Sequence, residues 1–284
     1  MTSKKEFLVL LQFNISFYLI VSVAIYFLAF AAGNEGVSIR LFGGGDDGYF
    51  YWEQSQKIAK GQTAVITSIY TIIIGYLMNF LNITDVIIIR FFNFLGYFLL
   101  LINSLFLLDF TIKKNKNLQI VINRDDFKSK KLLIVLFTFY LSLIMNTTLS
   151  IYRDIWIYLF CLLSVKELIY FMNKKTLKII HFILFILYFL LLYGFRTYAA
   201  LSIILSLIIY KVLISKRRKT NILLLILLGG IVYTFFKNIT FPIVNMSIED
   251  ALSYRDYFIS VAPGGSQMNI PLDQNNYLLF CLLH

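Results

Sequence analysis

The chain has 284 residues, of which 59% are hydrophobic and only 14% are charged. Soluble domains carry about 25% charged residues, so this composition, with a mean hydropathy of +0.78, excludes an ordinary soluble protein. The net charge of +11 does not indicate nucleic acid as a partner, because the lysines gather between hydrophobic stretches. Cys161 and Cys281 both lie in apolar stretches, where we expect buried thiols and neither a disulfide framework nor a metal site.

Apolar stretches of about 18 residues or more can cross about 30 Å of hydrocarbon as helices. The sequence predicts spans at residues 7–31, 84–112, 132–149, 155–172, 177–195, 198–214 and 222–241. Another apolar stretch starts at Tyr277 and stops at His284, too short to cross, so we expect a fragment of a longer bundle. The predicted fold class is all-α: one polytopic transmembrane domain over residues 1–284, with seven or eight visible spans.

The Lys and Arg distribution sets the predicted orientation of these spans. If residues 63–81 do not cross, every strongly basic segment falls on one side, with 17 Lys and Arg residues in and beside these segments against six in the opposite loops. Because basic loops stay in the cytoplasm, we expect a multi-pass plasma-membrane protein with a cytoplasmic N-terminus. Residues 32–83 and the proline-containing segment 242–276 are then outer loops, and residues 113–131 form a cytoplasmic loop.

The first outer loop carries the most informative motif. Gly43 to Gly45 precede the acidic pair Asp46-Asp47, and an amphipathic pattern follows from Asp47 to Gln62, where Gly61 can end a helix. Small polar residues then recur every fourth position from Thr63 to Asn79. Such a stripe on an otherwise apolar helix predicts a second helix, over residues 63–81, that lies in the membrane interface.

The predicted topology brings several ionisable residues to the outer side. Asp46 and Asp47 are either a helix N-cap, a general base for an acceptor hydroxyl, or ligands of a divalent metal such as Mg or Mn. Burying an arginine in a membrane costs free energy, and a guanidinium binds phosphate well. For three arginines the functional hypothesis is therefore a phosphate-binding site, and the alternative is an anchor at the membrane interface. The three are Arg90, Arg153 and Arg196; Asp154, Tyr49 and Tyr51 are further site candidates.

A second charged group lies near the predicted cytoplasmic ends of two spans. Lys166-Glu167 is expected to extend to the cytoplasm, as long charged side chains do near span ends. His181 is expected to pack without a functional role, because no second histidine is near it in the sequence.

The order of these features resembles the GT-C superfamily of membrane glycosyltransferases, which use polyprenyl-phosphate-linked sugars. The resemblance covers residues 1–112: Asp46-Asp47 in the first outer loop, two juxtamembrane helices (Tyr49 to Gln62 and Thr63 to Leu81), then Arg90 near the outer end of a span. Unlike many members, Gln62-Thr63-Ala64-Val65 contains no proline. The resemblance implies an inverting transfer to a glycan or lipid-linked acceptor, with Asp46 or Asp47 as base and the arginines on the leaving phosphate, in bacterial cell-surface polysaccharide assembly.

Two other hypotheses remain open. Ser150 to Asp154, with Arg196, is similar to the outer arginine segments of polymerases that join lipid-linked polysaccharide repeat units. A transporter or flippase for lipid-linked sugars needs no general base, but it typically shows repeated halves or spans broken by Pro or Gly, which this sequence lacks.

Overall fold

The computed structural model describes residues 3–39, 47–116, 125–173 and 178–214, all of which belong to one compact unit. Within these ranges the chain forms helices joined by short connections and no strand, which confirms the predicted all-α class. The predicted span 222–241 and the predicted outer loop 242–276 lie outside the described residues, as does Asp46.

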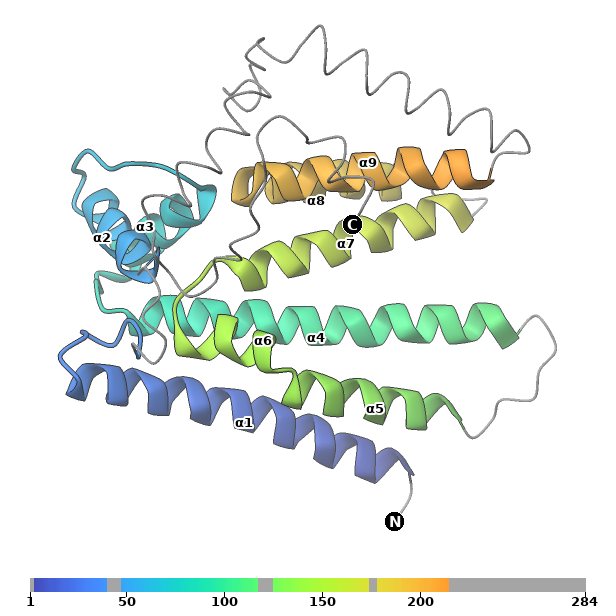
Figure 1. Cartoon of the computed structure of the whole chain (residues 1–284), viewed down its shortest axis with the longest axis horizontal. Helices are drawn as coiled ribbons and strands as arrows, with labels where there is room; N and C mark the ends of the chain where they lie inside the picture. The colour runs from blue at the N-terminus through green and yellow to red at the C-terminus, as the bar shows by residue number, and fades with distance from the viewer. Residues whose placement is uncertain (1–2, 40–46, 117–124, 174–177, 215–284) are drawn as a thin grey trace, which may run out of the picture. The chain divides into compact units, whose positions relative to one another are not determined.

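Long helices running along one axis make up most of the unit. They are α1 (Ser3–Ala31), α4 (Ile87–Lys116), α5 (Asp125–Phe139), α7 (Asp154–Asn173), α8 (Lys178–Phe195) and α9 (Thr197–Ile214). Figure 1 shows successive members of this set running in opposite directions. Among the described helices, α1 and α4 are long and apolar enough to cross a membrane, and one bent pair would make a third span. The apolar parts of α8 and α9 are shorter, so seven or eight spans are not confirmed.

Lysines gather at one end of these helices, which we call the basic end. Both α1 and α5 begin there (Figure 1). Lys131 Nζ lies 2.6 Å from Glu6 Oε2, and Lys130 Nζ lies 2.6 Å from Asp109 Oδ1, so ion pairs join α1, α4 and α5. The predicted basic loop 113–131 is shorter than expected, because α4 continues to Lys116 and α5 already starts at Asp125.

The opposite end, which we call the site end, carries the two short helices α2 (Asp47–Ala59) and α3 (Ile69–Leu81). At 1.5 Å per residue, the 13 residues of α3 extend about 20 Å, too short to cross a bilayer. In Figure 1, α1 ends and α4 begins at this same end, so residues 63–81 do not carry the chain to the basic end. The helix starts later than predicted because the Ser68 hydroxyl accepts a hydrogen bond from the Tyr70 amide (3.2 Å) and caps it.

Two small positions of α3 face the protein, whereas Asn79, in the same predicted stripe, is exposed. Thr71 and Gly75 are buried against α2, and a Cβ on Gly75 would lie 2.6 Å from Ile58 Cβ. The absent side chain therefore permits the close approach of the two helices, as small residues do between membrane helices. The outward face is apolar, with Tyr76 65% and Phe80 83% exposed. On the α2 side, the helix ends at Ala59 and Gly61 has a φ of +68°, as predicted for the stop signal.

The predicted span 132–149 is not one continuous helix. After α5 the chain bends by 57° at Tyr140 and continues as α6 (Leu141–Ile144) and a π-helical turn, η1 (Met145–Leu149). In an unbroken helix the Phe137 carbonyl would accept from the amide four residues on. It accepts a 2.8 Å hydrogen bond from the Tyr18 hydroxyl instead, so a side chain of α1 satisfies the carbonyl at the break. The break contains neither Pro nor Gly, which is why sequence analysis missed it.

This arrangement predicts how cysteines at the two ends react with a membrane-impermeant maleimide added to intact cells. Asn115→Cys, at the basic end, should stay unlabelled, and Gln62→Cys, in the exposed connection between α2 and α3, should be labelled. Both replacements belong in a background in which Cys161 and Cys281 are changed to alanine. Labelling of Asn115→Cys would overturn the predicted orientation.

Candidate functional site

Charged residues from three separate segments converge at the site end. Asp47 opens α2, Arg153 and Asp154 lie at the start of α7, and Arg196 lies in the break between α8 and α9. The buried ring of Tyr51 lies among them, with the Arg153 guanidinium carbon 5.4 Å from its centroid. We call these five residues the charged cluster.

The turn that carries Arg153 is held by two buried polar residues. Asn93 of α4 donates a 2.9 Å hydrogen bond from Nδ2 to the Tyr152 carbonyl. The Tyr70 hydroxyl of α3 lies 3.2 Å from the Ile151 carbonyl and 3.1 Å from Asn93 Oδ1. Because Tyr70 and Asn93 are both fully buried, they fix the backbone immediately before Arg153 against α3 and α4.

The charges of the cluster act on the pKa of the Tyr51 phenol. Its pKa is raised above the usual value, chiefly because burial disfavours the phenolate, and the charges of Asp47 and Asp154 raise it further. Arg153 and Arg196 act in the opposite direction. All four charged members therefore act on one buried ring, which stays protonated at neutral pH.

The charges of the cluster are only partly neutralised. Arg196 Nη1 lies 2.8 Å from Asp154 Oδ1, and the Arg196 guanidinium also lies 4.5 Å from the centroid of the Tyr198 ring. Within the described residues, by contrast, neither Arg153 nor Asp47 has an oppositely charged side chain within ion-pair distance. The cluster therefore offers one unpaired guanidinium and one exposed, unpaired carboxylate close to the same tyrosine.

Buried polar atoms without a partner also concentrate around this part of the fold. In the part of the chain that the structure describes, they are Ser150 Oγ, Trp156 Nε1 and Arg196 Nε. Such groups are rare in native proteins because each lost hydrogen bond costs about 1–3 kcal/mol. They lie in and beside the segments that carry Arg153 and Arg196, where an ordered water or a ligand would complete their hydrogen bonds.

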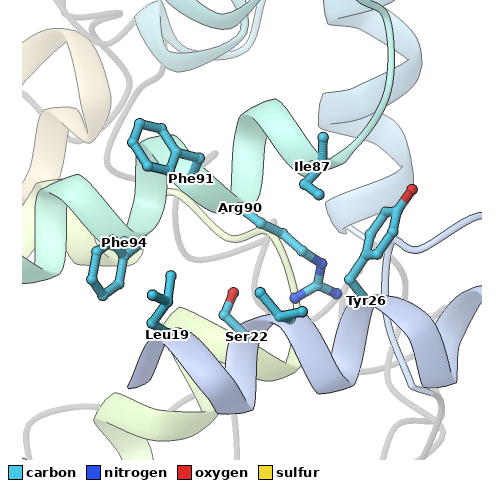
Figure 2. Close-up of a pocket in the computed structure, with 8 residues that line it drawn as sticks. Leu19, Ser22, Tyr26, Ile87, Arg90, Phe91 and Phe94 are labelled. Carbon is cyan, nitrogen blue, oxygen red and sulfur yellow. The ribbon is translucent and has the colours of Figure 1, made fainter. Parts of the chain in front are cut away.

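Arg90 does not belong to the charged cluster. Its Nε, Nη1 and Nη2 donate hydrogen bonds of 2.9, 2.6 and 2.9 Å to the carbonyls of Gly36, Thr148 and Val37, and the residue is only 3% exposed. Figure 2 shows the guanidinium between α4 and α1, beside Tyr26 in a cavity of about 150 Å³ that neither Arg153 nor Arg196 lines. Since its donors already bind backbone carbonyls, we leave Arg90 out of the phosphate site. Its role is structural: it joins α4 to the turn after α1 and to η1.

Replacing Arg90 with methionine should destabilise the fold. Three buried carbonyls would lose their donors, which at about 1 kcal/mol each lowers the free energy of unfolding by about 3 kcal/mol. Thermal unfolding in detergent measures the change, and Phe91→Met, at a neighbouring side chain that is 65% exposed, is the control. An Arg90→Met protein that unfolds normally but loses affinity for a prenyl phosphate would restore Arg90 to the phosphate site.

Two further predictions from the sequence concern Tyr49 and a metal site at Asp46 and Asp47. Tyr49 lies in the first turn of α2, with its ring edge-to-face against Trp52 at 6.1 Å. Within the described residues no three His, Cys, Asp or Glu side chains group as metal ligands. Asp46, the partner of Asp47 in the Mg or Mn hypothesis, lies outside those residues, so that hypothesis stays a prediction.

The Lys166-Glu167 pair does not extend to solvent as expected. Glu167 is 4% exposed, and its Oε2 lies 2.7 Å from His181 Nδ1, which joins α7 to α8. Lys166 Nζ donates a 2.8 Å hydrogen bond to Asn103 Oδ1 of α4. The packing of three helices therefore gives each polar group a partner inside the bundle, so neither residue needs to reach water.

The comparisons with known proteins returned no match: no protein-family model, no curated protein and no solved structure matches the chain.

Sequence analysis missed Tyr70 and Asn93, the two residues that hold the turn before Arg153. One signal was present: Asn93 lies three residues after Arg90, on the same face of α4, in an otherwise apolar segment. Nothing in the sequence indicates the role of Tyr70, because its hydroxyl reaches the carbonyl of residue 151 only through the tertiary packing of α3.

Proposed function

We propose that this protein is an integral membrane glycosyltransferase that transfers a sugar from a polyprenyl-phosphate carrier to a glycan or lipid-linked acceptor on the outer face of the plasma membrane. The observation that carries the proposal is that Asp47 and Arg153, neither of which has an oppositely charged partner among the described residues, lie near one tyrosine of the charged cluster. Transfer from a sugar phosphate needs these two functions, a base for the acceptor and a cation for the leaving group.

The proposed reaction is a single inverting displacement. The acceptor hydroxyl oxygen forms a bond to the anomeric carbon while the bond from that carbon to the phosphate oxygen breaks. Asp47 takes the acceptor proton, and the bonding electrons leave with the polyprenyl phosphate. Arg153 neutralises the charge that grows on this phosphate, for which a guanidinium offers paired donors. Arg196, held by Asp154 at 2.8 Å, is the second cation of the phosphate site.

An apolar groove supports the proposal that the substrate is linked to a lipid. The outward face of α3 and the first turns of α4 border a groove of about 750 Å³ that includes Ile73, Phe80 and Phe91. Its wall residue Phe92 stacks on Trp156 at 4.2 Å, and Trp156 follows Asp154 by two residues. An isoprenoid chain in this groove would lie within the hydrocarbon layer while its phosphate remains at the height of the charged cluster.

The repeat-unit polymerase is the second candidate, and one observation favours it. Arg153 and Arg196 act electrostatically on the same tyrosine, so the two arginines that the polymerase hypothesis requires lie in one cluster. The two hypotheses differ in the need for Asp47, and this difference is tested below.

The test of the proposed function uses the full chain in lipid vesicles with a polyprenyl-phosphate sugar and a mixture of glycan acceptors. We expect release of free polyprenyl phosphate that depends on both protein and acceptor. Movement of the intact lipid-linked sugar between leaflets, without release of carrier phosphate, would contradict a transferase and indicate a flippase.

A further inference from the structure

The hydroxyl of Tyr51 lacks the kind of partner that other buried tyrosines have. In the part of the chain that the structure describes, three tyrosines are fully buried, and each donates a hydrogen bond of 2.8 to 3.2 Å to an oxygen of another segment: Tyr18, Tyr70 and Tyr97. Tyr51 is 6% exposed, and its hydroxyl has no hydrogen-bond partner among the same residues. Because the hydroxyl of a buried tyrosine normally finds a partner, this donor needs a water or a ligand.

The ring of Tyr51 is fixed relative to the turn that carries Arg153. It packs edge-to-face against Tyr70 at 5.5 Å, and the Tyr70 hydroxyl lies 3.2 Å from the Ile151 carbonyl, two residues before Arg153. One buried side chain therefore contacts both the Tyr51 ring and the turn, so the Tyr51 hydroxyl is in position before a ligand binds. A donor that is preorganised in this way needs little reordering on binding.

The charges around the hydroxyl favour an anionic ligand. Of the charged groups, Arg153 has the largest effect on the pKa of Tyr51, followed by Asp47, Asp154 and Arg196. Because Asp154 and Arg196 pair with each other at 2.8 Å, the charge that acts most strongly on the hydroxyl is the positive charge of Arg153. A water satisfies the hydroxyl alone, whereas a phosphate has more than one free oxygen and can accept from the hydroxyl and from Arg153 together.

We propose that the Tyr51 hydroxyl binds the phosphate of the donor substrate, donating a hydrogen bond to one free oxygen while Arg153 donates to another. This role rests on the proposed transferase function and adds an uncharged donor to its phosphate site. When the bond from the anomeric carbon to the phosphate oxygen breaks, negative charge grows on the phosphate and both donors stabilise it. Tyr51 keeps its proton throughout, because Asp47 takes the proton of the acceptor hydroxyl.

The test measures the affinity of the full-length protein in detergent for a short-chain prenyl phosphate that carries no sugar. We expect Tyr51→Phe to bind this probe about tenfold more weakly or worse, the fold-change that corresponds to a hydrogen bond to a charged group. Without ligand, the thermal stability of Tyr51→Phe should equal that of the wild type, because the hydroxyl removed has no partner among the described residues.

Tyr97→Phe is the matched control. It removes the same atom from a fully buried tyrosine, but here the hydroxyl donates a 2.8 Å hydrogen bond to Asn14 of α1. This variant should lose thermal stability and keep its affinity for the prenyl phosphate, the reverse of the result expected for Tyr51→Phe. A merely structural role for Tyr51 would give both variants the same pattern.

Arg153→Ala, measured in parallel, separates a failure of this role from a failure of the proposed function. If Arg153→Ala binds the prenyl phosphate weakly and Tyr51→Phe binds it normally, the phosphate site stands and Tyr51 is not part of it. If Tyr51→Phe weakens binding only of the sugar-bearing donor, the hydroxyl contacts the sugar and the proposal is also wrong. A Tyr51→Phe protein that loses stability but not affinity would overturn the proposal too, because another segment of the chain would then bond the hydroxyl. A wild-type protein that does not bind the prenyl phosphate would contradict both the proposed function and this role.

Discussion

Asp47→Asn should lower the rate of sugar transfer by about 10²-fold or more while leaving donor binding nearly unchanged. General-base catalysis contributes about 10²–10⁴-fold, and asparagine cannot accept the proton of the acceptor hydroxyl. The replacement keeps the size of the side chain and its hydrogen-bonding capacity. It therefore removes the proposed chemistry and little else.

A structural role for Asp47 predicts a different result. Asp47 lies in the first turn of α2, and asparagine serves at helix N-termini about as well as aspartate. A position needed only for the helix would therefore leave near-normal activity. The matched control is Glu53→Gln in the same helix, which removes an exposed carboxylate that pairs with Lys57 at 2.7 Å and should leave the rate unchanged. Full activity of Asp47→Asn would remove Asp47 from the reaction.

Arg153→Ala should lower transfer by about 10²–10³-fold, the range measured when a single donor to a developing negative charge is removed. The reason is its position: Arg153 is partly exposed, has no acidic partner in the described part of the chain, and lies over the Tyr51 ring at 5.4 Å. Its guanidinium is therefore free to bind a phosphate. Arg153→Lys should recover only part of the activity, because an ammonium lacks the paired donors.

The control for Arg153 is Lys57→Ala, which also removes one positive charge near the site end, from α2. The readouts are the rate of transfer at saturating donor and the affinity of the protein for a short-chain prenyl phosphate. A merely structural role would lower thermal stability in parallel with activity. An Arg153→Ala protein of normal stability and normal activity would contradict the proposed phosphate site.

The two replacements together separate the transferase from the polymerase. Loss of activity in both variants supports a base and a phosphate-binding cation in one reaction. If Asp47→Asn stays active while Arg153→Ala and Arg196→Ala are inactive, the transferase proposal fails and the repeat-unit polymerase takes its place.

Helix type and approximate helix positions followed from the sequence because hydrophobic length and lysine placement are local signals. The observed helices α7, α8 and α9 begin and end within one residue of the predicted spans 155–172, 177–195 and 198–214. The end of α2 followed from Gly61, whose φ of +68° suits a residue without a side chain.

The break at Tyr140 could not be predicted in the same way. No proline or glycine marks it, and the carbonyl released there is satisfied by Tyr18, which lies 119 residues from Phe137 in the chain. Only the packing of α1 against α5 brings that donor to the break. The same holds for Glu167, whose partner His181 is on the next helix.

At the site, the sequence by itself determined which residue types are available: an acidic pair after a glycine run, and arginines near the ends of apolar stretches. Tertiary structure alone decided what each arginine does. The three carbonyls that occupy Arg90 come from residues 36, 37 and 148, brought together by the turn after α1 and by η1. Asp154 engages Arg196, while Arg153 lies over Tyr51 with no acidic partner in the part of the chain that the structure describes. A guanidinium binds whichever acceptors the fold brings within 3 Å, so its role depends on contacts between segments that are distant in sequence.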